Sequence, residues 1–432
     1  MATADVTMPT TQPAAARTTQ DDLRNYILVT AAYWADTLTD GAIRMLVLFY
    51  FFGLGYSPFK VASLFIFYEV FGVVTNLFGG YLAARLGLKI SLFAGLATQI
   101  VALAMLGLVG PAVLTVPYVM TAQALSGIAK DLTKLSSKSA VKLIVPDNAP
   151  STLYKWVAIL TGSKNALKGI GFFLGGLLLT VVGFRAALLL LAILVSVALV
   201  TTAVLMRGNL GTTNKKAKFR HMFSENRAVN ILAAARLFLF GSRDVWFVVG
   251  LPVFLYTVLH WNFWLVGGFL ALWTIGYGVV QAAAPRLIKR RAAGEGSEPD
   301  GRTATWLAFV LAAFPAGIAL ALLHNVDPAR VIVIGLTAFG VIFAMNSAVH
   351  SYLILAYTDN DRVAMNVGFY YMANAGGRLA GTVLSGLIYQ VYGLVGCLWA
   401  AVAFVLLAGL LSLALPTNVA LARPLAFGDG GE

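Results

Sequence analysis

Two cations occupy equivalent places in two apolar stretches of this sequence, residues 164–184 and 374–394. A shift of 210 residues brings Lys168 onto Arg378, and it also brings three glycines onto glycines: Gly171 onto Gly381, Gly176 onto Gly386 and Gly183 onto Gly393. A cation inside a long apolar segment costs about 2.5–3.5 kcal/mol to insert into a bilayer and by default marks a functional site. Its repetition indicates two half-molecules that face each other across a positively lined site, as expected of a transporter for an anion.

Other ionisable residues lie in the first and fifth apolar stretches. Asp36, Asp40 and Arg44 follow one another at intervals of four residues, so they share one face of a predicted helix. Asp40 and Arg44 can pair, which would make the helix cheaper to insert and would give them a structural role only. Lys164 lies one turn before Lys168, and no carboxylate occurs in that stretch. These two lysines therefore need an external anion or an acid from another helix.

Glu69 lies in the middle of the second apolar stretch, with no basic residue within one turn. Buried without a partner it would serve as a proton carrier, whereas held by Lys164 or Lys168 it would be structural. The sequence does not decide between these readings. Four buried acids are therefore candidates for coupling transport to protons, namely Asp36, Asp40, Glu69 and Asp244.

Three further stretches carry polar residues at helical spacing. Arg236 and Arg243 lie two turns apart on one face, and Arg236 either extends to the cytoplasmic surface or faces the site. Lys130 is the innermost of four lysines spaced by four, of which Lys138 and Lys142 are expected to touch lipid headgroups. The predicted substrate-binding residues are Arg44, Lys130, Lys164, Lys168, Arg236, Arg243, Tyr370, Asn374 and Arg378.

The composition indicates what positions these residues. The chain of 432 residues is 59% hydrophobic and 11% charged, which is typical of an all-α integral membrane protein with many spans. About twelve stretches reach the length of roughly 20 apolar residues that a span requires. They are centred near Val47, Val73, Ile100, Ala122, Phe172, Ile193, Leu239, Leu272, Phe309, Phe339, Tyr371 and Phe404.

The net charge of +13 reflects topology and does not indicate nucleic-acid binding. Lysines and arginines gather in alternate loops, so both termini and the basic loops are predicted to be cytoplasmic and the chain to lie in the cell inner membrane. The predicted organisation is a disordered tail (1–25), a six-helix half (26–206), a linker (207–228), a second six-helix half (229–415) and a second tail (416–432). The two halves are expected to be pseudo-symmetric.

Soluble catalysis has no support in the sequence. It contains no P-loop, no G-x-S-x-G and no H-E-x-x-H motif, and it has four histidines and the lone Cys397. We therefore expect no catalytic residue, no metal site and no cofactor. The energy for transport would come from an ion gradient or from the gradient of the substrate itself.

One loop resembles a motif of the major facilitator superfamily. The segment 80–89, GYLAARLGLK, is similar to G-x-L-x-D-R-x-G-[RK]-[RK], except that Ala84 replaces the acid and Leu88 replaces a base. The resemblance implies twelve helices in two halves. Because the acid usually takes part in a cytoplasmic gate, this gate must be built differently here or be weaker.

Longer runs resemble the ArsJ-type organoarsenical efflux permeases of that superfamily. They are NYILVTAAYW (25–34), LTDGAIRM (38–45), GYSPF (55–59), AQALSGIAKDLTK (122–134) and LTGSKNALKG (160–169). The resemblance implies export of 1-arseno-3-phosphoglycerate, made by a partner glyceraldehyde-3-phosphate dehydrogenase when arsenate replaces phosphate, and hence arsenate resistance. A drug exporter of the same fold would have an acid-lined, aromatic cavity, and a membrane sensor or enzyme would usually bring a soluble domain.

Overall fold

The structure is a computed structural model that describes residues 20–140, 150–208, 226–291, 299–358 and 363–417. These residues form thirteen α-helices and one short 3-10 helix. The first seven are α1 (Gln20–Gly53), α2 (Pro58–Ser63), α3 (Ile66–Leu86), α4 (Leu88–Leu108), α5 (Val116–Ala140), α6 (Pro150–Val181) and α7 (Gly183–Leu205). The others are α8 (Arg227–Phe247), α9 (Gly250–Thr257), α10 (Phe263–Arg291), α11 (Gly301–Leu323), α12 (Pro328–Ala356) and α13 (Val363–Ser412).

Eight helical stretches in the described part of the chain are long and apolar enough to cross a membrane. The long helices α1, α5 and α6 are not among them, and these three carry many of the charged residues predicted to form the site. The stretch formed by α8 and α9 is the most enclosed of the eight, since 78% of an apolar 18-residue segment within it is buried inside the protein.

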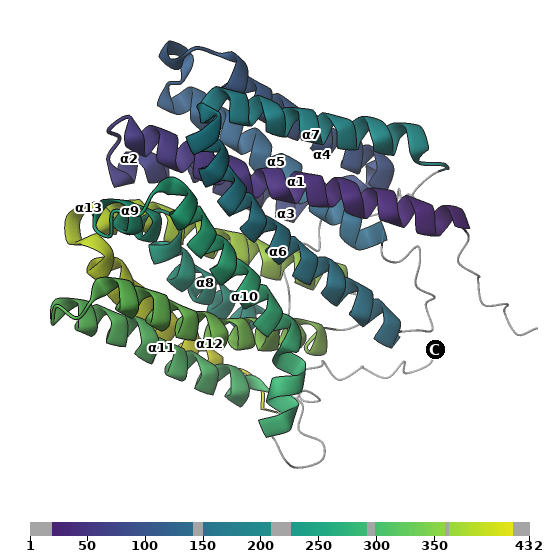
Figure 1. The fold of residues 1–432 in the computed structure, drawn as a ribbon. Helices are drawn as coiled ribbons and strands as arrows, with labels where there is room; N and C mark the ends of the chain where they lie inside the picture. Colours follow the sequence, from purple (N-terminus) through teal and green to yellow (C-terminus); the bar gives the residue numbers. More distant parts are fainter. Residues whose placement is uncertain (1–19, 141–149, 209–225, 292–298, 359–362, 418–432) are drawn as a thin grey trace, which may run out of the picture.

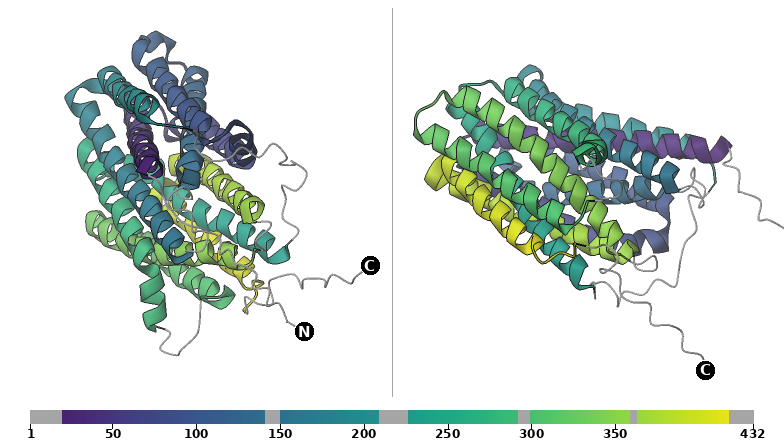
Figure 2. Two further views of the ribbon diagram at one scale, coloured as in Figure 1. Left: turned by 90° about the vertical axis from the view of Figure 1, so that its right-hand side faces the viewer. Right: turned by 90° about the horizontal axis from the view of Figure 1, so that it is seen from below.

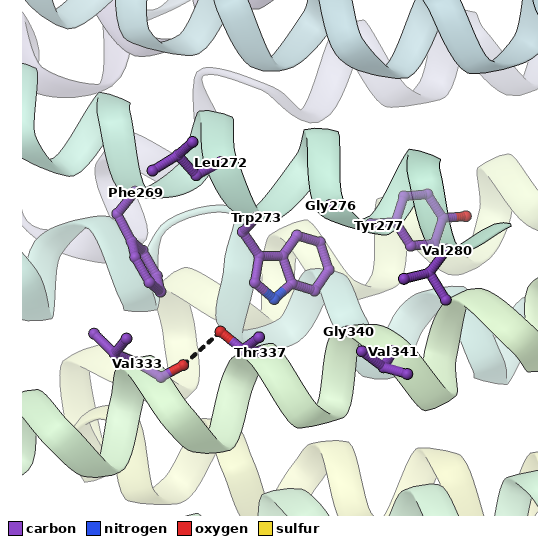
Figure 3. A pocket seen from close by; sticks show the side chains of 10 residues that line it. All are labelled: Phe269, Leu272, Trp273, Gly276, Tyr277, Val280, Val333, Thr337, Gly340 and Val341. Atoms are coloured by element: carbon purple, nitrogen blue, oxygen red, sulfur yellow. Dashed lines mark hydrogen bonds between the residues drawn. The ribbon is translucent and has the colours of Figure 1, made fainter. Parts of the chain in front are cut away.

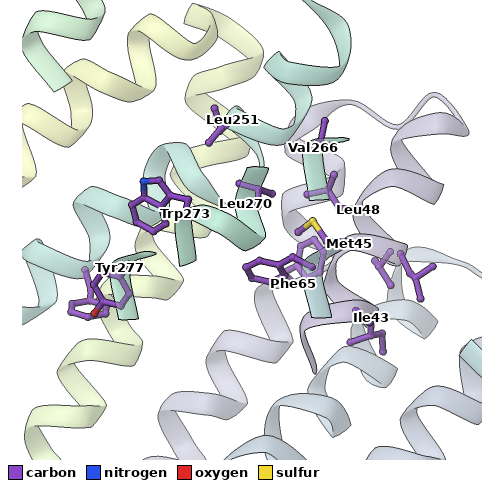
Figure 4. Packing of buried hydrophobic residues seen from close by; sticks show 14 of the residues in the cluster. Ile43, Met45, Leu48, Phe65, Leu251, Val266, Leu270, Trp273 and Tyr277 are labelled. Atoms are coloured by element: carbon purple, nitrogen blue, oxygen red, sulfur yellow. The ribbon is translucent and has the colours of Figure 1, made fainter. Parts of the chain in front are cut away.

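The helices form two groups. In Figure 1 the helices α1–α7 lie above α8–α13, and Figure 2 shows the two groups from two further directions. Helix α6 packs against α10, and α13 packs against both α2 and α3, so these helices make the junction between the groups. Figure 4 shows part of an apolar seam at this junction, where Met45, Leu48 and Phe65 lie near Val266 and Leu270.

Glycines allow the helices within each group to approach closely. Gly171 and Gly175 of α6 lie against the backbone of α1, and Gly377 and Gly381 of α13 lie against the backbone of α8. A Cβ atom at any of these positions would collide with the neighbouring backbone. These small residues therefore allow close helix packing.

Equivalent glycines also mediate the contact between the two groups. Gly176 of α6 lies against the backbone of Phe263 in α10, while Gly386 of α13 lies against Pro58 and Phe59 in α2. The glycines are 210 residues apart, which is the shift that aligns the two apolar stretches of the sequence, and the two phenylalanines are 204 residues apart. The two junctions are thus copies of one arrangement.

The last matched glycine pair ends a helix in each half. Gly183 separates α6 from α7 with φ 78°, and Gly393 breaks α13 with φ 62° and ψ −162°. Side chains other than that of glycine are rarely found at such positive φ values, because their Cβ atom clashes with the backbone. The residue type at these positions therefore fixes where the chain leaves one helix and begins the next.

The predicted boundary of the N-terminal tail is wrong. Helix α1 begins at Gln20, six residues before the first half was predicted to begin at residue 26. The Arg24 guanidinium donates to the carbonyl of Leu205, and Asn25 Nδ2 donates to the carbonyl of Arg207 at 2.7 Å. These contacts hold the start of α1 against the end of α7. Residues 1–19, 209–225 of the linker and 418–432 of the second tail lie outside the described residues.

Candidate functional site

A polar cavity of about 190 Å³ lies between the two groups of helices, below the 300–1,000 Å³ typical of sites for drug-sized ligands. Helices α1, α3, α5, α6, α8, α10, α12 and α13 all contribute to its wall. Eight described lining residues are cations and three are acids. The cations are Arg44, Lys130, Lys134, Lys164, Lys168, Arg236, Arg243 and Arg378, and the acids are Glu69, Asp131 and Asp244.

A chain of alternating charges crosses the cavity from one half to the other. Arg378 Nη2 lies 2.7 Å from Glu69 Oε1, and Arg378 Nε lies 3.5 Å from Asp244 Oδ2. The chain ends at Arg44, which is 3.4 Å from Glu69, and at Arg243, whose Nε donates to Asp244 at 2.6 Å. Neither alternative that the sequence left open for Glu69 is found, because its partners are two arginines, one of them from the other half, and not Lys164 or Lys168.

Asp40 is the acid from another helix that α6 requires. Lys168 Nζ lies 2.8 Å from Asp40 Oδ2, and the Tyr68 hydroxyl donates to Asp40 Oδ1 at 2.5 Å. The predicted pairing of Asp40 with Arg44 is not formed. The Arg44 guanidinium instead approaches Glu69 and lies 5.2 Å and 5.5 Å from the ring centres of Phe65 and Tyr68. Each of these acids therefore neutralises a cation that the cavity also exposes.

Asp36 differs from the other three acids proposed for proton coupling. It is fully buried behind the cavity wall, and Thr133 Oγ1 donates to its Oδ2 at 2.6 Å. Its Oδ1 has no hydrogen-bond partner, and no described cation lies within 4 Å of it. Glu69 and Asp244 line the cavity and Asp40 contacts it through Lys168. Among the described residues, Asp36 is thus the one candidate acid that forms no ion pair.

A second cluster of charged residues also lines the cavity. Asp131 accepts from Lys134 at 2.9 Å and lies 3.8 Å from Lys130, while Asn76 accepts from Lys134 at 2.7 Å. Lys134 also lies 5.2 Å from the ring centre of Tyr371 in α13. This contact joins α5 of the first group of helices to α13 of the second. The side chain of Lys138 and the whole of Lys142 lie outside the described residues.

Arg236 lies within the cavity wall and does not extend to the cytoplasmic surface. It is the tenth residue of the 21-residue helix α8, and only 4% of its surface is exposed. Its Nε donates to Asn374 Oδ1 at 3.0 Å. Tyr370, predicted to bind substrate, is not among the lining residues but packs behind Arg236, 5.0 Å from the guanidinium, while the next residue, Tyr371, lines the cavity.

Sequence reasoning missed several uncharged residues of the site. Asn165 Nδ2 donates to Gln281 Oε1 at 3.3 Å, which joins α6 to α10 across the two halves. Gln281 Nε2 and the hydroxyl of Tyr277 both lie 3.2 Å from Ser347 Oγ. Single amides inside apolar stretches were the signal that could have found Asn165 and Gln281. Tyr277 and Ser347 carry no such signal, because both residue types are common in spans.

A second cavity, of about 360 Å³, is apolar and lies between α10 and α12 (Figure 3). Trp273 and Tyr277 line it and also line the polar cavity, so these two rings form a shared wall. Trp273 Nε1 donates to the carbonyl of Leu336 at 2.7 Å, which ties the wall to α12. No charged residue lines this groove, whereas Leu272 at its edge is 73% exposed. Of these two cavities, only the central one is lined by charged residues in the described part of the chain.

Comparison with known proteins identifies one family. A family model described as Major Facilitator Superfamily matches residues 27–352, about three quarters of the chain. No curated protein matches the sequence. Among the described residues, no group of three or more histidines, cysteines or acids could hold a metal ion.

Proposed function

Because the chain belongs to the Major Facilitator Superfamily, we propose that it is a secondary transporter that exports an anionic ester of phosphate and arsenate by alternating access. A multi-pass membrane protein with a transport fold is what the family and the apolar helices indicate. The direction of transport and the substrate are the parts that we propose. The observation that carries the proposal is the excess of cations over acids in the wall of the central cavity.

The proposed topology has twelve crossings, with both termini in the cytoplasm and the chain in the inner membrane. Helix α13 supplies two crossings, because its 50 residues break at Gly393. The charged helices α1, α5 and α6 supply three more, since their charges face other helices and the cavity. An even number of crossings leaves both termini on the same side. The two six-helix halves, 26–206 and 229–415, would then rock around the cavity between them.

The cavity chemistry favours an oxyanion ester. Arginine binds a phosphate or arsenate group through two parallel hydrogen bonds, and lysine attracts it as a point charge. Eight cations against three acids leave an excess of positive charge even if every acid is ionised. Buried cations that lack a counter-charge remain costly until an anion arrives. Anion binding is therefore the event that this cavity is built to favour.

The specific substrate, 1-arseno-3-phosphoglycerate, rests on the resemblance of the sequence runs to ArsJ-type permeases. Its phosphate and arsenate groups lie at opposite ends of a three-carbon chain, which suits a cavity with cations on both halves. Lys164 and Lys168 belong to one half, and Arg243 and Arg378 belong to the other. A glyceraldehyde-3-phosphate dehydrogenase would supply the adduct, and its export would confer arsenate resistance.

We propose exchange against protons as the energy source. Three of the four candidate acids have a cation partner, so a proton arriving there would have to displace that partner. Asp36 has none within 4 Å in the described residues, and a proton can supply the missing positive charge. We therefore assign proton binding to Asp36.

Transport into everted membrane vesicles tests the proposal. Labelled 3-phosphoglycerate, and the adduct generated in place by glyceraldehyde-3-phosphate dehydrogenase with arsenate, are supplied with and without a pH gradient. We expect uptake that depends on the protein and that rises with the gradient. Vesicles from cells lacking the protein are the control. Uptake of lipophilic cations with no uptake of either ester would contradict the proposal.

A further inference from the structure

The four arginines of the cavity differ in their partners. Arg44, Arg243 and Arg378 each lie within 3.5 Å of a carboxylate oxygen. Arg236 has no carboxylate within 4 Å in the described part of the chain, although only 4% of its surface is exposed. It is thus a deeply buried arginine whose charge no neighbouring acid neutralises.

Neutral groups hold the Arg236 side chain instead. Its Nε donates to Asn374 Oδ1 at 3.0 Å, and its Nη1 donates to both the carbonyl and the hydroxyl of Ser347 at 3.1 Å. The rings of Phe240 and Tyr370 lie 4.0 Å and 5.0 Å from the guanidinium carbon. Among the described residues, no hydrogen bond involves Nη2. These contacts fix the orientation of the guanidinium and leave its charge available.

Ser347 lies at the centre of this arrangement. Its hydroxyl oxygen is 3.1 Å from Arg236 Nη1 and 3.2 Å from both the Tyr277 hydroxyl and Gln281 Nε2. Gln281 in turn accepts from Asn165 of α6. A network with three contacts at one hydroxyl restrains every member, so the position of the guanidinium depends on both halves of the protein.

The energetics distinguish Arg236 from the other cavity arginines. A buried cation with only neutral partners retains most of its desolvation cost, whereas a cation with a carboxylate recovers part of it through attraction. An incoming anion binds Arg236 without displacing an acid. To bind Arg378 it must compete with Glu69 and Asp244. The first contact of an oxyanion is therefore most favourable at Arg236.

We propose that Arg236 is the anchor for one oxyanion group of the substrate and that Ser347 is the residue that positions it. This inference rests on the proposed function, since it names the anchor of the same site. Arg378, whose pair with Glu69 joins the two halves, then serves to hold them together in the substrate-free state.

Binding to the purified protein in nanodiscs tests the anchor, with 3-phosphoglycerate and inorganic phosphate as probes. Arg236→Gln should weaken the binding of both by about tenfold or more, because a charge-assisted hydrogen bond from the guanidinium is lost. Arg236→Lys should recover part of the affinity. Arg185→Gln is the matched control, since Arg185 lies outside the cavity and donates to carbonyls of Gly107 and Leu108.

The stability of the ligand-free protein gives a second, independent measure. Arg236→Gln removes a cation that has no acid partner, so its melting temperature should stay close to that of the wild type. Arg378→Gln leaves Glu69 without its closest cation and should lower the melting temperature. A fall as large for Arg236→Gln as for Arg378→Gln would show that Arg236 is structural and would overturn the anchor.

Positioning by Ser347 predicts a different pattern. Ser347→Ala should raise the KM for transport and leave the maximal rate largely unchanged, and Ser347→Thr should restore the KM by restoring the hydroxyl.

Normal 3-phosphoglycerate binding by Arg236→Gln would overturn the anchor and leave the proposed function intact. Phosphate binding that depends on Arg236, without transport of any ester by the wild type, would support the anchor and overturn the proposed function. Absence of binding of either probe by the wild type would overturn both.

Discussion

At the scale of single residues, the cavity contains cations whose carboxylate partners a substrate oxyanion can replace. Glu69 accepts from Arg378 at 2.7 Å and lies 3.4 Å from Arg44, so it is shared between the two halves. A substrate oxyanion that binds Arg378 would release Glu69 to Arg44 alone. The junction between the halves would then lose an ion pair as the substrate binds, which couples binding to their relative movement.

Removal of Arg378 should destabilise the protein. We expect Arg378→Gln to cost about 3–5 kcal/mol, because Glu69 is left buried without its closest cation. The double variant Arg378→Gln with Glu69→Gln should recover much of this stability and remain inactive in vesicle transport. Thermal unfolding in detergent, compared with uptake, separates the two effects. Full activity of the double variant would show that the pair has no role in transport.

A matched loss of transport is expected for Lys168→Ala, the equivalent position in the first half. It leaves Asp40 with Tyr68 as its remaining close donor among the described residues. We expect the variant to insert into the membrane and to lose both uptake and arsenate resistance. Lys89→Ala is the control, because Lys89 is remote from the cavity and contacts the carbonyl of Gly208. Normal uptake by Lys168→Ala would exclude it from the site.

Replacement of Asp36 should separate exchange from proton coupling. We expect Asp36→Asn to retain exchange of 3-phosphoglycerate across vesicles in the absence of a gradient, and to lose the increase that a pH gradient produces. The amide can still accept from Thr133, so the local packing is kept. Asp327→Asn, at an exposed turn, is the control. A response of Asp36→Asn to the gradient equal to that of the wild type would exclude Asp36 as the carrier.

The sequence predicted which residues form the site better than it predicted their partners. Eight of the nine predicted substrate-binding residues line the cavity, because a buried charge stands out in an apolar stretch. Tyr370 packs behind the cavity wall and does not line the cavity. The sequence does not indicate which face of a helix a tyrosine in a membrane span occupies. The partner of Glu69 is 309 residues away in the chain, and no local spacing can reveal such a pair.

At the scale of helices, small residues determine how closely the helices approach. Gly171 of α6 packs against Gly41 of α1, close in the chain to Lys168 and Asp40, which form an ion pair between the same two helices. The size of residue 171 therefore affects the distance between these two partners. The sequence shows Gly171 as one of the matched glycines of the two apolar stretches. It did not predict that the first helix begins at Gln20, because that boundary depends on contacts with the end of α7.

A methyl group at Gly171 should therefore impair folding and transport. We expect Gly171→Ala to cost about 1–3 kcal/mol, because its Cβ would meet the backbone of α1. Gly162→Ala in the same helix has open space around it and should be neutral or slightly stabilising. Melting temperatures of the two variants check the prediction. Equal stability would show that α6 can move away from α1 at no cost.

At the scale of the whole molecule, the excess of positive charge should select the ligand. We expect 3-phosphoglycerate to compete with the transported ester, because it presents two anionic groups to the cations of both halves. Arsenite, which is neutral at pH 7, and ethidium, which is a cation, should not compete. Inhibition of labelled uptake by each compound measures this. Competition by ethidium or arsenite, with none by 3-phosphoglycerate, would favour a drug exporter of the same fold.

The repeated glycine contacts between the halves have a consequence for assembly. Gly176 meets the region of Phe263, and Gly386 meets the region of Phe59, so each half presents the same pair of complementary surfaces. This is the geometry of an isologous interface, as in a homodimer with twofold symmetry, although one chain forms it. Recognition between the halves therefore does not require the peptide connection between residues 209 and 225. Two fragments produced separately on either side of it contain every surface needed to reassemble.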